Sequence, residues 1–169
     1  LSDIKVDNVS VSGFNKDKLI YNLTVPGATD SVSVSAVVED TGKATITTDL
    51  SNKFNLNFGS NQIDIIVTAE NGDLKTYTLF IERSKRVNAY LKDLKINDKT
   101  ITGFNKSKTI YDLGEVDYNT TALKVEGIAE DELATVLGNG LINLSTGSNT
   151  ITLTVKAHDT SVSEIYKIT

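Results

Sequence analysis

The stretch GFNKDKLIY, residues 13–21, returns almost unchanged as GFNKSKTIY at residues 103–111. The flanking sequence repeats with it, because residues 1–21 align with residues 91–111 without a gap. The later stretch GSNQIDIIVTAENG (59–72) likewise resembles GSNTITLTVKAHDT (147–160). The sequence therefore predicts two copies of one unit, residues 1–85 and 86–169, with the second copy stopping before its last strand is complete. Identical residues recur at a constant spacing for Leu1, Asp3, Lys5, Gly13, Phe14, Asn15, Lys16, Lys18, Ile20 and Tyr21.

Apolar and polar residues alternate within each unit over short runs. Successive side chains on a strand point to opposite faces, so a period of two predicts strands with one buried face. Turn residues separate the runs, and Asn71-Gly72 predicts a hairpin because this pair adopts positive φ at little cost. Only the stretch 129–137 allows any helix, and one turn at most. In the first unit the runs are Leu19–Val25, Val32–Val38, Phe54–Phe58, Ile63–Ala69 and Tyr77–Ile81, and the other turn signals are Pro26-Gly27, Thr41-Gly42 and Gly59-Ser60-Asn61.

About seven short strands per unit predict an all-β fold, with an immunoglobulin-like β-sandwich in each copy. The opening stretch then has a structural interpretation. Phe14 and Tyr21 are large apolar residues at fixed places in both copies, and we expect them to hold the two sheets together. The alternative is that Phe14 and Phe104 are exposed binding anchors.

Four sequence elements recur in the same order in both copies: an N-terminal apolar strand, Phe and Tyr seven residues apart, an alternating strand led by Gly-x-Asn, and a closing strand that begins with Tyr. In this order they resemble the bacterial cadherin-like β-sandwich domain family. The resemblance implies a tandem module of secreted or wall-attached proteins, commonly Gram-positive, that acts as a spacer or binding accessory beside other domains. Thr160 stands where the first copy has Gly72, so we expect a longer hairpin there.

The composition excludes several classes of partner. A net charge of −5 and a pI near 4.9 argue against nucleic-acid binding and against attachment to anionic lipid, since both need a basic face. No apolar run is long enough to span a bilayer, so membrane insertion is not expected. The chain has no Cys, which excludes disulfides and fits a bacterial surface protein better than a secreted animal domain. Because the chain does not begin with an initiator Met, we expect a fragment or a processed form.

Metal and cofactor sites are not expected. Calcium needs several oxygen ligands that converge from a loop, and the chain has no Asp-x-Asp or EF-hand pattern. Its densest acidic stretch, Glu130-Asp131-Glu132, is interpreted as a solvated loop, while the stretch from Glu82 to Tyr90 is net basic. The cadherin-like resemblance therefore carries over the fold and not the calcium.

Catalytic chemistry also lacks its usual residues, so we expect no enzyme. His158 is the only histidine, its counterpart in the first copy is Glu70, and we expect it to point outward at a strand end. The GNG at Gly138 lacks the Lys-Ser/Thr of a phosphate-binding loop and predicts a turn. A Lys–Asn isopeptide crosslink would need a buried lysine, yet every lysine stands beside polar residues.

Tyr90 and Tyr118 break the repeat, because neither has an aromatic counterpart in the first copy. Sugar-binding sites often use exposed aromatic faces, so these two residues are the candidate ligand-contact site. The structural alternative is that Tyr90 packs at the junction of the units.

The sequence thus predicts a non-catalytic spacer or adhesion module of a bacterial extracellular protein, with neighbouring domains, a surface glycan or a protein as partners. The competing hypothesis is a carbohydrate- or wall-polymer-binding module beside a secreted enzyme. We expect the linker, about residues 84–89, to hold a fairly fixed angle because it has no Gly-Ser run.

Overall fold

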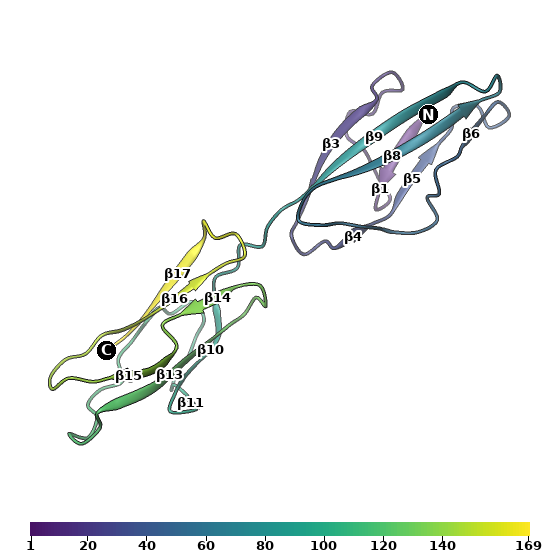
Figure 1. The fold of residues 1–169 in the computed structure, drawn as a ribbon. Coiled ribbons are helices and arrows are strands. Elements are labelled where there is room, and N and C mark those ends of the chain that lie inside the picture. The colour runs from purple at the N-terminus through teal and green to yellow at the C-terminus, as the bar shows by residue number, and fades with distance from the viewer. The chain divides into compact units, whose positions relative to one another are not determined.

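A computed structural model describes residues 1–169 and divides into two compact units, Leu1–Lys85 and Arg86–Thr169 (Figure 1). Every regular element is a β-strand, which confirms the all-β prediction. The stretch 129–137 contains no helix; it holds a turn in which the Ala134 N–H donates to the Asp131 carbonyl at 3.0 Å. No helix is long and apolar enough to cross a membrane.

The first unit is a sandwich of a three-stranded sheet, in the order β2-β1-β5, and a four-stranded sheet, in the order β3-β9-β8-β6, with the short pair β4-β7 beside them. The parallel pairing of β3 with β9 joins the early and late parts of the unit. Its strands are β1 (Asp3–Val6), β2 (Val9–Ser10), β3 (Ile20–Val25), β4 (Ser31–Val32), β5 (Val34–Val37), β6 (Ala44–Ile46), β7 (Phe54–Asn55), β8 (Gly59–Ala69) and β9 (Leu74–Arg83).

The second unit has two four-stranded sheets, β11-β10-β13-β15 and β12-β17-β16-β14. The parallel pair β12-β17 corresponds to β3-β9 but is shorter. Its strands are β10 (Leu91–Ile96), β11 (Lys99–Thr100), β12 (Ile110–Tyr111), β13 (Ala122–Ala129), β14 (Thr135–Leu137), β15 (Gly140–Asn143), β16 (Ile151–Lys156) and β17 (Ser163–Ile168).

Each unit encloses its own hydrophobic core. Alternation places Ile63, Ile65 and Val67 of β8 in the first core, as the period of two predicts. In the second core, Ile151, Leu153 and Val155 of β16 occupy the corresponding places. These repeated apolar residues of β8 and β16 therefore serve the internal packing of each copy.

The repeated stretch is a loop fastened by two tyrosine hydroxyls. The Tyr21 hydroxyl donates to the Asn15 carbonyl at 2.7 Å and accepts the Asn15 N–H at 3.0 Å. The Tyr77 hydroxyl donates to the Lys16 carbonyl at 2.7 Å. Phe14 is half-buried against the core, with its ring centroid 5.8 Å from that of Tyr21. Both phenylalanines thus pack inward, since Phe104 stacks on Tyr111 in the same way.

Several predicted runs differ from the strands observed. Val32 to Val38, expected as one strand, is divided between β4 and β5 because the N–H and Oγ of Ser33 both donate to Asp7 Oδ1. The run Phe54 to Phe58 forms only the two-residue strand β7. Gly59, Ser60 and Asn61, expected as a turn, begin β8. There the Asn61 side chain bonds to the backbone of Asn57 and Gly59.

The hairpins follow the sequence signals more closely. Asn71-Gly72 does connect β8 to β9, with Gly72 at φ +87°. The corresponding hairpin of the second unit, between β16 and β17, is longer by one residue. In the first unit the Ala69 N–H donates to the Asp73 carbonyl, whereas in the second the Ala157 N–H donates to the Val162 carbonyl. This confirms the expectation from Thr160 and explains why the closing strands align one residue out of step.

Candidate functional site

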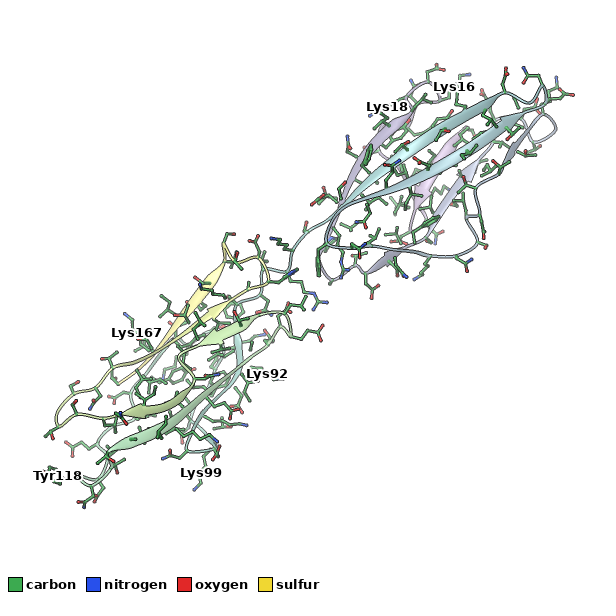
Figure 2. The ribbon with its side chains drawn as sticks, viewed as in Figure 1. Lys16, Lys18, Lys92, Lys99, Tyr118 and Lys167 are labelled. Atoms are coloured by element: carbon green, nitrogen blue, oxygen red, sulfur yellow. The ribbon has the colours of Figure 1, made fainter.

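Tyr118 lies on an exposed turn between β12 and β13. Asp117 shapes this turn, because its Oδ1 accepts the Asn119 N–H at 2.8 Å and its carbonyl accepts the Thr120 N–H at 2.8 Å. The Tyr118 side chain is 86% exposed and extends from the end of its unit (Figure 2). An aromatic ring held on a turn in this way is available for stacking against a ligand.

Tyr90 lies at the other end of the same sheet. It immediately precedes β10, its carbonyl accepts the Glu130 N–H at 2.8 Å, and its side chain is 42% exposed. Glu130 follows the last residue of β13, whereas Tyr118 precedes its first. The eight residues of β13 therefore separate the two tyrosines, by roughly 25 Å at the usual rise of a strand. The structure does not bring them together into one site.

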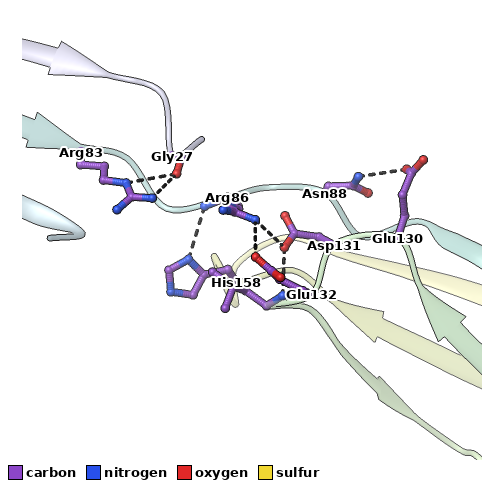
Figure 3. A network of polar contacts seen from close by, with 9 residues as sticks. Gly27, Arg83, Arg86, Asn88, Glu130, Asp131, Glu132 and His158 are labelled. Carbon is purple, nitrogen blue, oxygen red and sulfur yellow. Dashed lines mark hydrogen bonds and ion pairs between the residues drawn. The ribbon is translucent and has the colours of Figure 1, made fainter. Parts of the chain in front are cut away.

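A polar cluster that the sequence analysis missed surrounds the segment before β10 (Figure 3). Arg86 Nη1 lies 3.4 Å from Asp131 Oδ1 and 3.3 Å from Glu132 Oε1. Asn88 Nδ2 donates to Glu130 Oε2 at 3.0 Å. The residues Arg86, Asn88, Glu130, Asp131, Glu132 and His158 are called the entry cluster below, and the segment Arg86–Tyr90 the entry segment.

The acidic stretch at residues 130–132 is only in part the solvated loop that we expected, because Glu130 and Glu132 are exposed but Asp131 is buried. Asp131 is only 9% exposed, and its Oδ1 also accepts the Leu133 N–H at 2.9 Å. Glu130 binds Lys106 at 2.8 Å. Hydrogen bonds from Lys106 and then from Asn88 hold the pKa of Glu130 below its ordinary value. These carboxylates are paired with cations of their own unit.

His158 does not point freely outward. It is half-buried, and its Nδ1 lies 3.5 Å from the backbone nitrogen of Arg86, where the N–H donates to it. The neighbouring Asp159 N–H donates to the Arg86 carbonyl at 2.8 Å. The loop after β16 therefore holds the backbone of the entry segment, which is a packing role.

No group of three or more His, Cys, Asp or Glu side chains is arranged to hold a metal ion. The lysines all lie at the surface, fully or partly exposed, including the labelled Lys16, Lys18, Lys92, Lys99 and Lys167 (Figure 2). None is placed in a core where an isopeptide crosslink would form. The polar side chains of the entry cluster thus support ion pairing and hydrogen bonding inside one unit.

One signal in the sequence could have revealed the entry segment. Ala89 is buried in the second core and stands two residues before Leu91, so it continues the inward alternation of β10. Because alanine is small and only weakly hydrophobic, a hydropathy pattern does not identify it as a core residue. Arg86 and Asn88 give no comparable signal, because their partners lie more than forty residues away in sequence.

Solved structures similar to the chain are cadherin ectodomains. The structure described as PcdhgB3 EC1-4 in 50 mM HEPES has 12% identity and a TM-score of 0.34, and the match covers 90% of this chain and 48% of that one. The structure described as Protocadherin gammaB7 EC3-6 cis-dimer has 13% identity and a TM-score of 0.31, covering 90% and 46%. The chain spans about half the length of each. Similarity at this level supports no inference about partners or calcium.

No curated protein matches the chain significantly. The sequence model described as Cadherin-like beta sandwich domain matches it twice, over residues 1–84 and 91–169. Those two matches cover both repeats and nearly the whole chain. The chain therefore belongs to the cadherin-like β-sandwich domain family and carries two tandem copies of that domain.

Proposed function

We propose that this chain is a non-catalytic tandem module of a bacterial extracellular or cell-surface protein, where it serves as a spacer or as an adhesion segment that binds protein. Its partners are then the neighbouring domains of a longer chain and a protein or glycan at the cell surface. Membership of the cadherin-like family supports the coarser part of this proposal, a binding or adhesion module.

The observation that carries the proposal is the use of the repeated residues. Phe14, Tyr21 and Tyr77 fasten one loop to the core of the first copy, and their counterparts do the same in the second. The aromatic side chains that the two copies share are thus used for cohesion, while the carboxylates of the entry cluster are paired within the unit. This is the pattern of a scaffold that presents its surface, and it contrasts with the convergent unpaired groups of an active site.

The extracellular assignment is supported by the composition. A chain of 169 residues without cysteine, built on two self-contained cores, needs no oxidative folding and tolerates redox changes outside the cell. To test it, antibodies raised against the purified chain would be applied to intact and permeabilised cells of the source bacterium. Intact cells are expected to be labelled, and treatment with an external protease should remove that labelling. Labelling only after permeabilisation would contradict the assignment.

The exposed ring of Tyr118 favours a second candidate, the carbohydrate- or wall-polymer-binding module. A glycan array probed with the wild-type chain, Tyr118→Ala, Tyr90→Ala and Leu141→Ala separates the two. Leu141 is the control, because it is another exposed large apolar residue of the same unit. Binding that is lost only in a tyrosine variant would support the carbohydrate module, and an array without signal would support the spacer or protein-binding module.

A further inference from the structure

The strand β15 lies at the edge of its sheet, because the order β11-β10-β13-β15 gives it a single neighbour. The Leu144 N–H, just after the strand, donates to the Thr121 carbonyl at 2.8 Å and so faces the β13 side. In an antiparallel pair the bonding side alternates from one residue to the next. Leu141 and Asn143 therefore direct their N–H and carbonyl groups away from β13.

The residue opposite Leu141 supports this direction. Lys124 lies across from Leu141, but its N–H donates to Asn97 Oδ1 at 3.0 Å and its carbonyl accepts the Asn97 N–H at 2.8 Å. Lys124 thus bonds on its other side. The structure shows no hydrogen bond to the backbone of Leu141 or Asn143, and both residues are exposed. The β15 edge, meaning the outward backbone groups of these two residues, therefore has free donors and acceptors at the surface.

The β15 edge is also uncharged, in a chain whose net charge is −5. No Asp, Glu, Lys, Arg or His occurs from Leu133 to Val155, although charged residues make up 23% of the sequence. Edge strands of natural proteins commonly carry a lysine, a proline or a bulge that prevents pairing with another chain. The strand β15 has none of these, and the Leu141 side chain is 71% exposed.

The first unit protects the matching edge. Counted from the repeated strands β1 and β10, Phe54 of β7 corresponds to Ile142 of β15. Lys53, which is exposed, therefore stands where the second unit has Leu141. A lysine at this position disfavours pairing, because an added strand would have to desolvate its charge. The same edge is thus protected in one copy and unprotected in the other.

A second copy of the chain has the chemistry that this edge needs. When two β15 strands pair antiparallel about a two-fold axis at Ile142, Leu141 of each copy lies opposite Asn143 of the other. Each of these two pairs can exchange both backbone hydrogen bonds. Ile142, half-buried against the second core, then meets the Ile142 of the other copy and is covered further. Two acidic chains can approach here because the edge itself carries no charge.

We propose that the β15 edge is a self-association surface, at which two copies of the chain join their sheets by antiparallel pairing of β15. The edge is short, so the dimer is weak, with a dissociation constant on the order of 0.1–1 mM. The two-fold pairing uses the same edge of both copies, so assembly stops at the dimer. The inference does not depend on whether the chain serves as a spacer or as an adhesion segment.

Sedimentation velocity of the full chain, at concentrations that span the expected dissociation constant, tests the proposal. The wild-type chain should shift from monomer toward dimer as its concentration rises. Leu141→Lys introduces the lysine of the first unit and should weaken the association by about tenfold or more. Val9→Lys is the matched control, because Val9 is 70% exposed on the edge strand β2 and its counterpart in the second unit is Lys99. This control adds the same charge and should leave the association unchanged.

Amide hydrogen exchange at low and high protein concentration locates the contact. The Leu141 and Asn143 amides should exchange more slowly at high concentration in the wild-type and Val9→Lys chains. A wild-type chain that stays monomeric over the whole range would overturn the proposal, as would a dimer that Leu141→Lys leaves intact. A dimer without protection of these two amides would also overturn it. Protection that arises only when an uncharged peptide is added would assign the edge to a foreign strand and refute self-association.

Discussion

The hydroxyl of Tyr77 donates a hydrogen bond to the carbonyl of Lys16 at 2.7 Å, across 61 positions of the chain. Tyr166 makes the same bond to Lys106 in the second unit. Burial raises the pKa of both hydroxyls above their ordinary value, so each remains a protonated donor at neutral pH. The loop of the repeated stretch is therefore fastened to a closing strand in both copies.

Removal of this hydroxyl should loosen the loop of one unit only. Tyr77→Phe is expected to lower the free energy of unfolding of the first unit by about 1–2 kcal/mol, because the partly buried Lys16 carbonyl loses its donor. Tyr166→Phe should have the same effect on the second unit. Hydrogen exchange of the core amides in each unit measures the loss of stability in both variants. Tyr118→Phe, at an exposed tyrosine, is the control. Equal loss of protection in both units from either variant would contradict the expected independence.

Gly138 occupies a position that no side chain fits. Its φ is +97°, and a Cβ added there would lie 2.4 Å from the Thr152 carbonyl oxygen. Gly147 has nearly the same φ, +96°, but open space around it. Gly147→Ala should therefore cost about 1–2 kcal/mol from backbone strain alone, and Gly138→Ala several kcal/mol more than that. Thermal unfolding followed by calorimetry tests this, and equal shifts for the two variants would show that the strand relaxes around the new methyl group.

Asp131 and Glu132 contact the same guanidinium but differ in burial. The Asp131 side chain is 8% exposed and that of Glu132 is 78% exposed. Asp131→Ala is expected to destabilise the second unit by about 2–3 kcal/mol, because it leaves Arg86 and the Leu133 N–H without their buried acceptor. Glu132→Ala should change the free energy of unfolding by less than about 0.5 kcal/mol. Chemical denaturation of the two variants gives the comparison, and a larger effect from Glu132→Ala would refute it.

The carboxyl group of Glu130 should make the stability of the second unit depend on pH in the acidic range. Its pKa is lowered in the folded protein, chiefly by the hydrogen bond from Lys106 and next by that from Asn88. A depressed carboxyl pKa contributes stability that is fully present above the unfolded pKa and is lost as the pH falls through the folded value. NMR titration of Glu130 should show this, with Lys106→Met raising its pKa more than Asn88→Ala does. An unchanged titration in Lys106→Met would contradict the assignment.

Local signals in the sequence predicted the features that a few neighbouring residues determine. Asn71-Gly72 forms its hairpin because positive φ is a property of those residues. The alternation of Ile63, Ile65 and Val67 places them inward because a strand has a period of two. The tight turn at Asp7-Asn8, where both residues have positive φ, was not predicted although an Asx pair of this kind favours it.

Features that depend on distant partners escaped prediction. Asp131 is buried because Arg86 and Asn88 cover its loop, and nothing within the stretch 130–132 reveals this. Ser33 interrupts a strand because Asp7, 26 residues earlier, accepts its N–H. The candidate site at Tyr90 and Tyr118 was chosen from broken repeat symmetry, which identifies unusual residues but does not place them on one surface. Their role in ligand contact stays a prediction.

The tyrosines that bond to the loop also determine the near-ultraviolet circular dichroism of the first unit. The chain has no tryptophan, and Tyr21 and Tyr77 are the only tyrosines of the first unit. Both rings are buried in the core of the unit, and their hydroxyls bond to that loop, so their surroundings are fixed and asymmetric. Near-ultraviolet circular dichroism from the first unit is therefore dominated by these two tyrosines. Opening of the loop would change this signal, while the far-ultraviolet circular dichroism of the β-strands would persist.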